Sequence, residues 1–348
     1  MNDFCIIKVL FFTALAFIFT IAWTPLLTYF LYKYKIGKHI RDDGSSPIFS
    51  KMHSKKSGTP TMGGLLIWVT VLIFCVLFYY LSQILPFEFF KNLNFLSRNQ
   101  TLLPLGCLVA SALVGLTDDI LDSKKMGYKK RGIKFWHKLI MYAVIALVGA
   151  LWFYFKLDWD IVHIPFLGNF DIGVYYILFF IATVIGTSFA VNQTDGLDGL
   201  AGGTLLASFG TYAIIAFTLG KFDLAVFCGV ISGALMAFLW FNINPARFFM
   251  GDTGSMSLGV TLALVALYTH TVFILPFIGI IFVIEAISTI IQILSKKFLH
   301  KKVFLSSPIH HHLEAKGWPE PKIVMRFWII SFASVAIGLV IFLLDKTL

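Results

Sequence analysis

The feature that most constrains this chain is the regular return of long, nearly uncharged apolar runs. A helix needs roughly 20 apolar residues to cross the hydrocarbon core of a bilayer, and nine runs approach or exceed that length, with a tenth, shorter candidate at 255–269. The nine are 5–31, 63–86, 101–117, 139–155, 173–191, 199–219, 224–241, 272–294 and 326–344. We therefore predict an all-α, polytopic integral membrane protein with about ten transmembrane helices.

Composition supports this class and excludes others. Only 13% of the residues are charged, against about 25% in soluble domains. The four cysteines lie in apolar runs without CxxC spacing, so neither a disulfide framework nor a zinc site is indicated. The first run lacks a small-residue cleavage site, so we expect no cleavable signal peptide. The net charge of +10 comes mostly from loops, which favours a bilayer surface over nucleic acid as the partner.

Lysine and arginine predict the orientation. Loops 32–62, 118–138 and 295–326 hold seven each, and the positive-inside rule places such loops in the cytoplasm. An even number of spans then puts both termini in the periplasm. No segment between the spans is large enough to fold alone. We expect one transmembrane domain, 1–348, whose chemistry lies on cytoplasmic loops at 32–62, 118–138, 190–199, 242–255 and 295–326.

An adjacent acidic pair, Asp118 and Asp119, closes the uncharged run 101–117. Neighbouring ionised carboxylates repel each other, and at a membrane boundary they keep only part of their hydration. Such a pair needs a cation, a shared proton or open water. An acidic cap where a span reaches solvent is an equally good interpretation of the pair alone.

Polar motifs recur at the same boundary. Lys55 and Lys56 precede a Gly-Thr-Pro-Thr61-Met-Gly-Gly stretch that leads into a span; its backbone N–H groups favour an anion, although a simple helix-starting turn fits too. The stretch 192–199 holds Asn192, Asp195 and Asp198. The two acids would share a face if the stretch opened a helix. They would then accept from the donor groups of a sugar or base, or act as ordinary helix caps.

The next cytoplasmic loop combines Asn242, Phe248, Phe249 and a Gly-Asp252-Thr-Gly-Ser turn. One carboxylate beside exposed N–H groups suits a hard divalent cation that holds a phosphate. A phenylalanine here either anchors the chain at the interface or offers a face on which a base stacks.

Histidines and one buried acid complete the set. His310, His311 and His312 are consecutive, which makes phosphate contact or proton transfer more plausible than a closed metal site. A solvated loop with incidental histidines is the alternative. Glu285 lies in the middle of a span, where an acid is either functional or bonded to a neighbouring helix.

In this order the motifs resemble the phospho-N-acetylmuramoyl-pentapeptide transferase family, within the polyprenyl-phosphate N-acetylhexosamine-1-phosphate transferase superfamily. The resemblance runs from about residue 33 to 330. It implies a bacterial inner-membrane enzyme with its active site facing the cytoplasm. The implied reaction transfers phospho-N-acetylmuramoyl-pentapeptide from its uridine diphosphate carrier to undecaprenyl phosphate, giving lipid I and uridine monophosphate. A homodimer is compatible with it.

The resemblance also implies site roles. Mg²⁺ is expected on Asp252 with Asp118 nearby, and Asp118, Asp119, Asp252 and His310 are the expected catalytic residues. Phe249 matches the residue that stacks on uracil. The other expected substrate-binding residues are Lys56, Thr61, Asn192, Asp195, Asp198, Asn242, His311 and His312. Asp122 departs from the expected pattern and could compete as a ligand, and the motifs leave direct displacement and a phospho-aspartate intermediate both open.

Three rival functions are less consistent with the sequence. A transporter usually places polar groups near the midplane, often in repeated halves, whereas here the acids gather at one boundary and no internal repeat is evident. A purely structural scaffold needs no set of polar motifs on one side. A sister transferase that uses another nucleotide sugar is the closest alternative.

Overall fold

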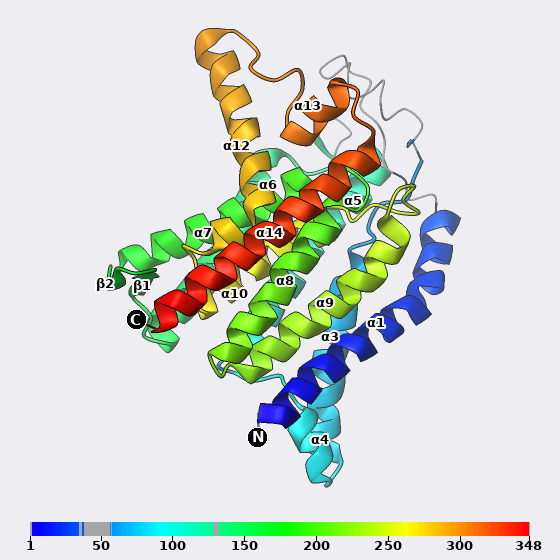
Figure 1. Cartoon of the computed structure of the whole chain (residues 1–348). Coiled ribbons are helices and arrows are strands. Elements are labelled where there is room, and N and C mark those ends of the chain that lie inside the picture. The colour runs from blue at the N-terminus through cyan, green and yellow to red at the C-terminus, as the bar shows by residue number, and fades with distance from the viewer. Residues whose placement is uncertain (1, 35–36, 38–55, 57, 129–131, 348) are drawn as a thin grey trace.

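The computed structural model describes residues 2–34, 37, 56, 58–128 and 132–347, and its regular structure is almost entirely helical (Figure 1). The one sheet within those ranges is a short antiparallel hairpin of β1 (Ile161–Ile164) and β2 (Gly168–Asp171). The prediction of an all-α, polytopic membrane protein is confirmed. Parts of the basic loops 32–62 and 118–138, Lys55 included, lie outside the described residues.

Eight of the described helices are long and apolar enough to cross a membrane. They are α1 (Asn2–Lys33), α3 (Leu65–Ile84), α5 (Leu102–Ser123), α6 (Phe135–Lys156), α7 (Tyr175–Thr194), α8 (Leu200–Thr218), α9 (Phe222–Asn242) and α14 (Glu320–Thr347). The shorter elements are α4 (Glu88–Leu93), α10 (Asp252–Tyr268), α11 (Leu275–Ile278), α12 (Ile280–Leu294), a π-helical turn (Ser295–Leu299) and α13 (Ile309–Ala315). Two expected spans are therefore irregular: 255–269 is the 17-residue α10, and 272–294 is divided at Gly279. The count of ten spans stays a prediction.

The centre of the bundle is formed by α8, α9 and α10. Every residue of α10 after Asp252 is buried, as expected for a helix that is apolar on all sides. It packs between α5 and α7 at close range, because glycines remove side chains at the contacts. A Cβ on Gly115 of α5 would lie 2.4 Å from the carbonyl oxygen of Asp252, and one on Gly259 would lie 2.6 Å from Cα of Ser188. This packing brings the first turn of α10 beside the last turns of α5.

Helix α12 projects beyond the end of the bundle (Figure 1) and contacts α7, α13 and α14. Its buried side includes Glu285, Ser288 and Gln292, while isoleucines such as Ile287 and Ile290 are exposed. Polar residues thus face the protein and apolar ones face outward, the reverse of a soluble helix. This pattern suits a helix whose outer surface meets lipid.

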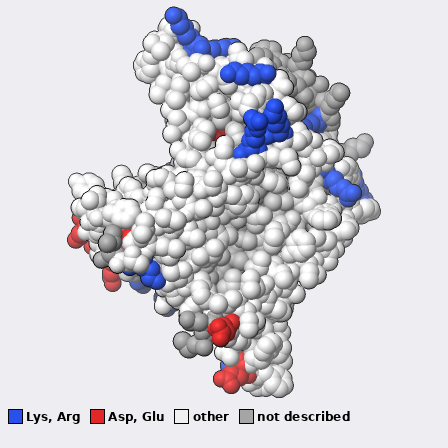
Figure 2. Space-filling view, viewed as in Figure 1, with Lys and Arg blue, Asp and Glu red and all other residues white. Residues whose placement is uncertain are grey.

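The two ends of the bundle differ in chemistry. Both chain termini lie toward the end that carries α4 and the β-hairpin, and α13 lies at the other end (Figure 1). Lysines and arginines gather around the α13 end in this view, and acidic side chains show mainly at the opposite one (Figure 2). The charge asymmetry that the loops predict is therefore visible on this face of the protein.

Candidate active site

Three charged side chains from three helices meet at the start of α10. Lys138 Nζ of α6 lies 2.5 Å from Oδ2 of Asp118 on α5 and 2.5 Å from Oδ2 of Asp252 on α10. The backbone N–H of Ile133 donates to Asp118 Oδ1 at 2.6 Å, and Asn192 Nδ2 donates to Asp252 Oδ1 at 2.8 Å. Two largely buried carboxylates thus share one ammonium. Burying these charges costs free energy of desolvation, which the ion pairs and hydrogen bonds offset.

Asp119 has a different role from its neighbour. Its oxygens accept hydrogen bonds from the backbone N–H groups of Asp252 and Thr253, at 3.1 and 3.0 Å. It therefore caps α10 from another helix, because the first N–H groups of a helix have no partner within it. Helix α5 continues to Ser123, so the pair lies inside the helix and the two carboxylates of consecutive residues point to different partners. Asp122 follows Asp118 by one helical turn.

The loop before α10 packs against the Gly-Thr-Pro-Thr-Met-Gly-Gly stretch. The N–H groups of Gly63 and Gly64 donate to the carbonyls of Phe249 and Met250, at 2.7 and 2.9 Å. These amides are thus engaged by the protein and do not form the open anion site that the sequence suggested. Thr61 is buried beside Gly251, whose φ of +74° and lack of space for a Cβ both require glycine.

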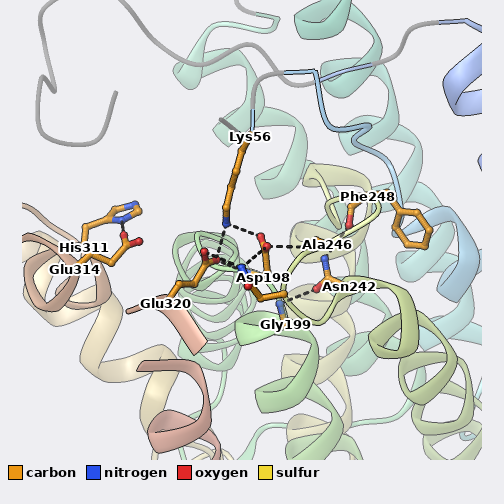
Figure 3. Close-up of polar contacts among 10 residues, drawn as sticks. Lys56, Asp198, Gly199, Asn242, Ala246, Phe248, His311, Glu314 and Glu320 are labelled. Carbon is orange, nitrogen blue, oxygen red and sulfur yellow. Dashed lines mark hydrogen bonds and ion pairs between the residues drawn. The ribbon is translucent and has the colours of Figure 1, made fainter. Parts of the chain in front are cut away.

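A second polar cluster surrounds Asp198 (Figure 3). Lys56 Nζ lies 2.7 Å from Asp198 Oδ1 and 2.6 Å from Oε1 of Glu320, in the first turn of α14. Asp198 Oδ2 accepts from Asn244 Nδ2 and from the N–H of Ala246, at 3.0 and 3.1 Å. The cluster therefore joins the first basic loop, the α7–α8 connection and the α9–α10 connection.

Asn242 and the two phenylalanines complete this side of the site. Asn242 accepts from the N–H of Gly199 at 3.0 Å and donates to the carbonyl of Phe248 at 2.8 Å. Phe248 is fully buried, whereas Phe249 is partly exposed and lies 5.9 Å from Lys56 Nζ, measured to its ring centroid. Of the two rings, Phe249 is the one next to the charged cluster.

The stretch 192–199 ends one helix and precedes another. Asn192 is in the last turn of α7, Asp195 is its C-cap, and Asp198 comes just before Gly199, the N-cap of α8. The two acids would share a face only if the stretch opened a helix at Asp195; instead the chain turns between them, so they do not. Asp198 belongs to the Lys56 cluster, and Asn192 belongs to the group at Asp252.

The three histidines have three separate environments. His310 Nδ1 lies 2.9 Å from Glu285 Oε2, and both side chains are fully buried. His311 Nδ1 lies 2.7 Å from Glu314 Oε2, and His312 Nδ1 accepts from the N–H of Leu305 at 3.1 Å. Burial, with a smaller contribution from Lys316, lowers the pKa of His312. Glu285 is thus paired with a histidine from α13.

His310 also lies against the α7–α8 connection. A Cβ on Gly196 would be 2.2 Å from His310 Nε2. Neither that nitrogen nor Glu285 Oε1 has a hydrogen-bond partner among the residues that the structure describes. The histidine segment therefore borders the loop that carries Asp195 and Asp198.

Three residues of the site escaped the sequence analysis: Lys138, Glu320 and Asn244. Lys138 is one of seven basic residues in its loop, and no local pattern distinguishes it. Glu320 stands in a Trp-Pro-Glu-Pro turn that opens α14, and a lone acid before an apolar run reads as an ordinary helix start. The described residues contain no group of three or more His, Cys, Asp or Glu side chains placed to hold a metal.

The protein is a multi-pass helical membrane protein. Near one end it carries paired carboxylates, a lysine and a second ionic cluster. These features define the class of membrane enzymes that act on charged groups at the bilayer boundary. Comparison with known proteins specifies the class. The Glycosyl transferase family 4 profile matches residues 101–270, and phospho-N-acetylmuramoyl-pentapeptide-transferase signature 1 matches residues 56–67. The chain belongs to the phospho-N-acetylmuramoyl-pentapeptide-transferase family.

Relatives of that name match over nearly their whole length. The protein of Anoxybacillus flavithermus is 40% identical over 336 residues, which cover 96% of this chain and 98% of the relative. That of Lacticaseibacillus paracasei is 40% identical over 332 residues, covering 94% and 96%. That of Chloroflexus aggregans is 39% identical over 350 residues, covering 95% and 89%.

Proposed function

We propose that this chain catalyses its family's reaction through the group formed by Asp118, Lys138 and Asp252. The phosphate of undecaprenyl phosphate forms a new bond to the sugar-linked phosphorus of uridine-diphospho-N-acetylmuramoyl-pentapeptide. The bond between the two phosphates of the carrier breaks, so uridine monophosphate leaves and lipid I remains in the membrane. The observation that carries the proposal is the convergence of two carboxylates from separate helices on one cationic position.

The residues at this position fit Mg²⁺. This ion prefers oxygen ligands and binds through one or two carboxylates while it keeps water and phosphate oxygens. Asp118 and Asp252 each place an oxygen 2.5 Å from the same ammonium, so one cation can reach both. When bound, Mg²⁺ would neutralise charge on the diphosphate. Lys138 then supplies a second positive charge, and Asp118 orients the acceptor phosphate or takes its proton.

The second cluster is the proposed nucleotide end of the site. Phe249 offers a ring for uracil, and Lys56 lies beside that ring. Asp198 pairs with Lys56, and Asn242 bonds to the backbone of Gly199 and Phe248 on either side of the cluster. Asp252 lies three residues after Phe249, which keeps a diphosphate within reach of both ends. His310, His311, Asn192, Asp195 and Thr61 are proposed to line the space around the sugar and phosphates.

The location of the site follows from charge. Lysines and arginines gather at the α13 end on the face shown in Figure 2, so the positive-inside rule predicts that this end faces the cytoplasm and that both termini are periplasmic. A soluble nucleotide sugar and a membrane lipid can meet there. The inner membrane is the proposed location, and a homodimer is a further prediction that native mass spectrometry in lipid discs would check.

The test is a competition between nucleotide sugars. Purified protein receives undecaprenyl phosphate, Mg²⁺ and an equimolar mixture of labelled uridine-diphospho-N-acetylmuramoyl-pentapeptide and uridine-diphospho-N-acetylglucosamine. We expect labelled lipid I and an equal amount of uridine monophosphate. A lipid product that carries N-acetylglucosamine alone would assign the chain to a sister reaction instead.

A further inference from the structure

We propose that Glu320 is a positioning residue for the nucleotide end of the site: it holds Lys56 and the loop of Asp198 in the arrangement that receives a uridine-diphospho sugar. The inference rests on the proposed function and adds to it. Glu320 lies outside every motif that the sequence analysis selected, and we do not expect it to touch the substrate.

Glu320 uses both of its carboxylate oxygens to join three distant segments. Oε1 accepts from Lys56 Nζ at 2.6 Å and from the backbone N–H of Asp198 at 2.7 Å. Oε2 accepts from Asn244 Nδ2 at 3.1 Å. A single side chain at the start of α14 therefore fixes the first basic loop and the connections on either side of α8 and α9 (Figure 3).

Burial strengthens the ion pairs of this cluster. The side chains of Lys56, Asp198 and Glu320 are 22%, 3% and 11% exposed. Ion pairs this sheltered are screened less than surface pairs. Removal of Glu320 would leave the N–H of Asp198 without its acceptor, at a cost in the loop's own stability. The ordered position of the loop thus depends on a residue more than 120 positions away.

Glu320 affects ligand binding through Lys56, because it fixes the position of the Lys56 side chain. Its long, flexible side chain carries a large rotamer entropy, and here it is held between two carboxylates. The same ammonium lies 5.9 Å from the centroid of Phe249, the proposed stacking ring. Glu320 therefore holds the Lys56 ammonium beside the proposed position of the base before the nucleotide arrives, which lowers the entropic cost of binding.

The experiment separates a positioning role from a structural one by steady-state kinetics. Glu320→Ala should raise KM for the nucleotide sugar about tenfold, a typical effect of losing a residue that orients a ligand-binding group. Both kcat and KM for undecaprenyl phosphate should stay within about twofold. Glu320→Gln should recover part of the loss, because its amide oxygen still accepts from Lys56. In a Lys56→Met background, Glu320→Ala should add less than about twofold.

Glu88→Ala is the matched control, because Glu88 also stands in the first turn of a helix, α4, at the other end of the bundle. The proposal is overturned if Glu320→Ala leaves KM for the nucleotide sugar unchanged. It is equally overturned if kcat and both KM values change together with the unfolding midpoint, or if the effect is as large without Lys56. If Glu320→Ala does not fold, the KM of Glu320→Gln for the nucleotide sugar tests the proposal instead, and an unchanged KM would overturn it. A wild-type protein that makes no lipid I would contradict the proposed function and not this inference.

Discussion

The carboxylate of Asp119 caps the helix that begins at Asp252, through the N–H of Asp252 itself at 3.1 Å. Its neighbour Asp118 is instead bonded to Lys138. Asp119→Asn should therefore mainly destabilise the protein, by about 1 kcal/mol, and lower its unfolding midpoint. Asp118→Asn should mainly lower kcat while nucleotide binding persists. Thermal unfolding and calorimetric titration of both variants check this; equal midpoints and equal kcat losses would contradict it.

Lys138 is predicted to be essential for turnover. Lys138→Met removes the ammonium that contacts both Asp118 and Asp252, and a lost charge contact in phosphoryl transfer costs roughly a hundredfold in rate or more. Lys134→Met is the control: Lys134 is the N-cap of the same helix and lies over the ring of Tyr128, 5.4 Å from its centroid. We expect the control to keep nearly full activity. Equal activity of the two variants would exclude a special role for Lys138.

Alanine substitutions of the adjacent phenylalanines should affect different properties, nucleotide binding for Phe249 and stability for Phe248. Phe249→Ala removes the proposed stacking face and should weaken nucleotide binding about ten- to hundredfold, since base stacking is worth roughly 1–3 kcal/mol. Phe248 is fully buried, so Phe248→Ala should instead lower the free energy of unfolding by about 3–5 kcal/mol. Nucleotide titration and thermal unfolding of each variant separate the two effects. Weakened binding in Phe248→Ala alone would reverse the assignment.

His270, in the turn after α10, predicts a pH dependence of stability. Burial, with smaller effects of Lys221 and His163, lowers the pKa of His270 to about 4. As the pH falls, His270 therefore takes up a proton near pH 6.5 in the unfolded chain, but only near pH 4 in the folded protein. Stability should fall as the pH drops from about 6.5 to about 4, by at most about 3 kcal/mol.

His270→Asn tests that prediction, because asparagine tolerates the φ of +54° found there. The variant should show a flatter decline of the unfolding midpoint between pH 6.5 and 4. His163→Gln is the contrasting variant: burial opposes its protonation, yet hydrogen bonds to Asp345 and Asn169 raise the pKa of His163. Its contribution is present below about pH 6.5 and is lost as the pH rises through the raised pKa. An unchanged slope in His270→Asn would contradict the assignment.

The fold class could be predicted because lipid imposes length and composition on each span. The irregular elements, α10 and the span divided at Gly279, could not be predicted in detail, because tertiary contacts accommodate their backbone and polar groups. Helix α10 is short but enclosed by protein, and Glu285 is tolerated because His310 reaches it from α13. Neither partner is visible from a local pattern, since the two residues are 25 positions apart.

Members of the candidate site stand out in the sequence where polar residues are concentrated in a motif, and less so where a single residue makes contacts across the fold. Asp118, Asp198, Phe249 and Asp252 stand in polar clusters that interrupt apolar runs. Lys138 resembles any other loop lysine until α6 brings it between two carboxylates. The stretch that holds Gly63 and Gly64 is compatible in sequence with an anion site or with a simple helix-starting turn. In the structure, the N–H groups of both glycines bond to carbonyls of the α9–α10 connection.

The measurement that tests this account most directly is the initial rate of lipid I formation by wild-type protein and by Asp252→Asn. Both receive labelled uridine-diphospho-N-acetylmuramoyl-pentapeptide, undecaprenyl phosphate and Mg²⁺. The account predicts Mg²⁺-dependent lipid I from the wild type and a rate at least a hundredfold lower from the variant, with an unchanged helical circular dichroism spectrum. Full activity of Asp252→Asn, or lipid I formation by the wild type in the presence of a chelator, would contradict it.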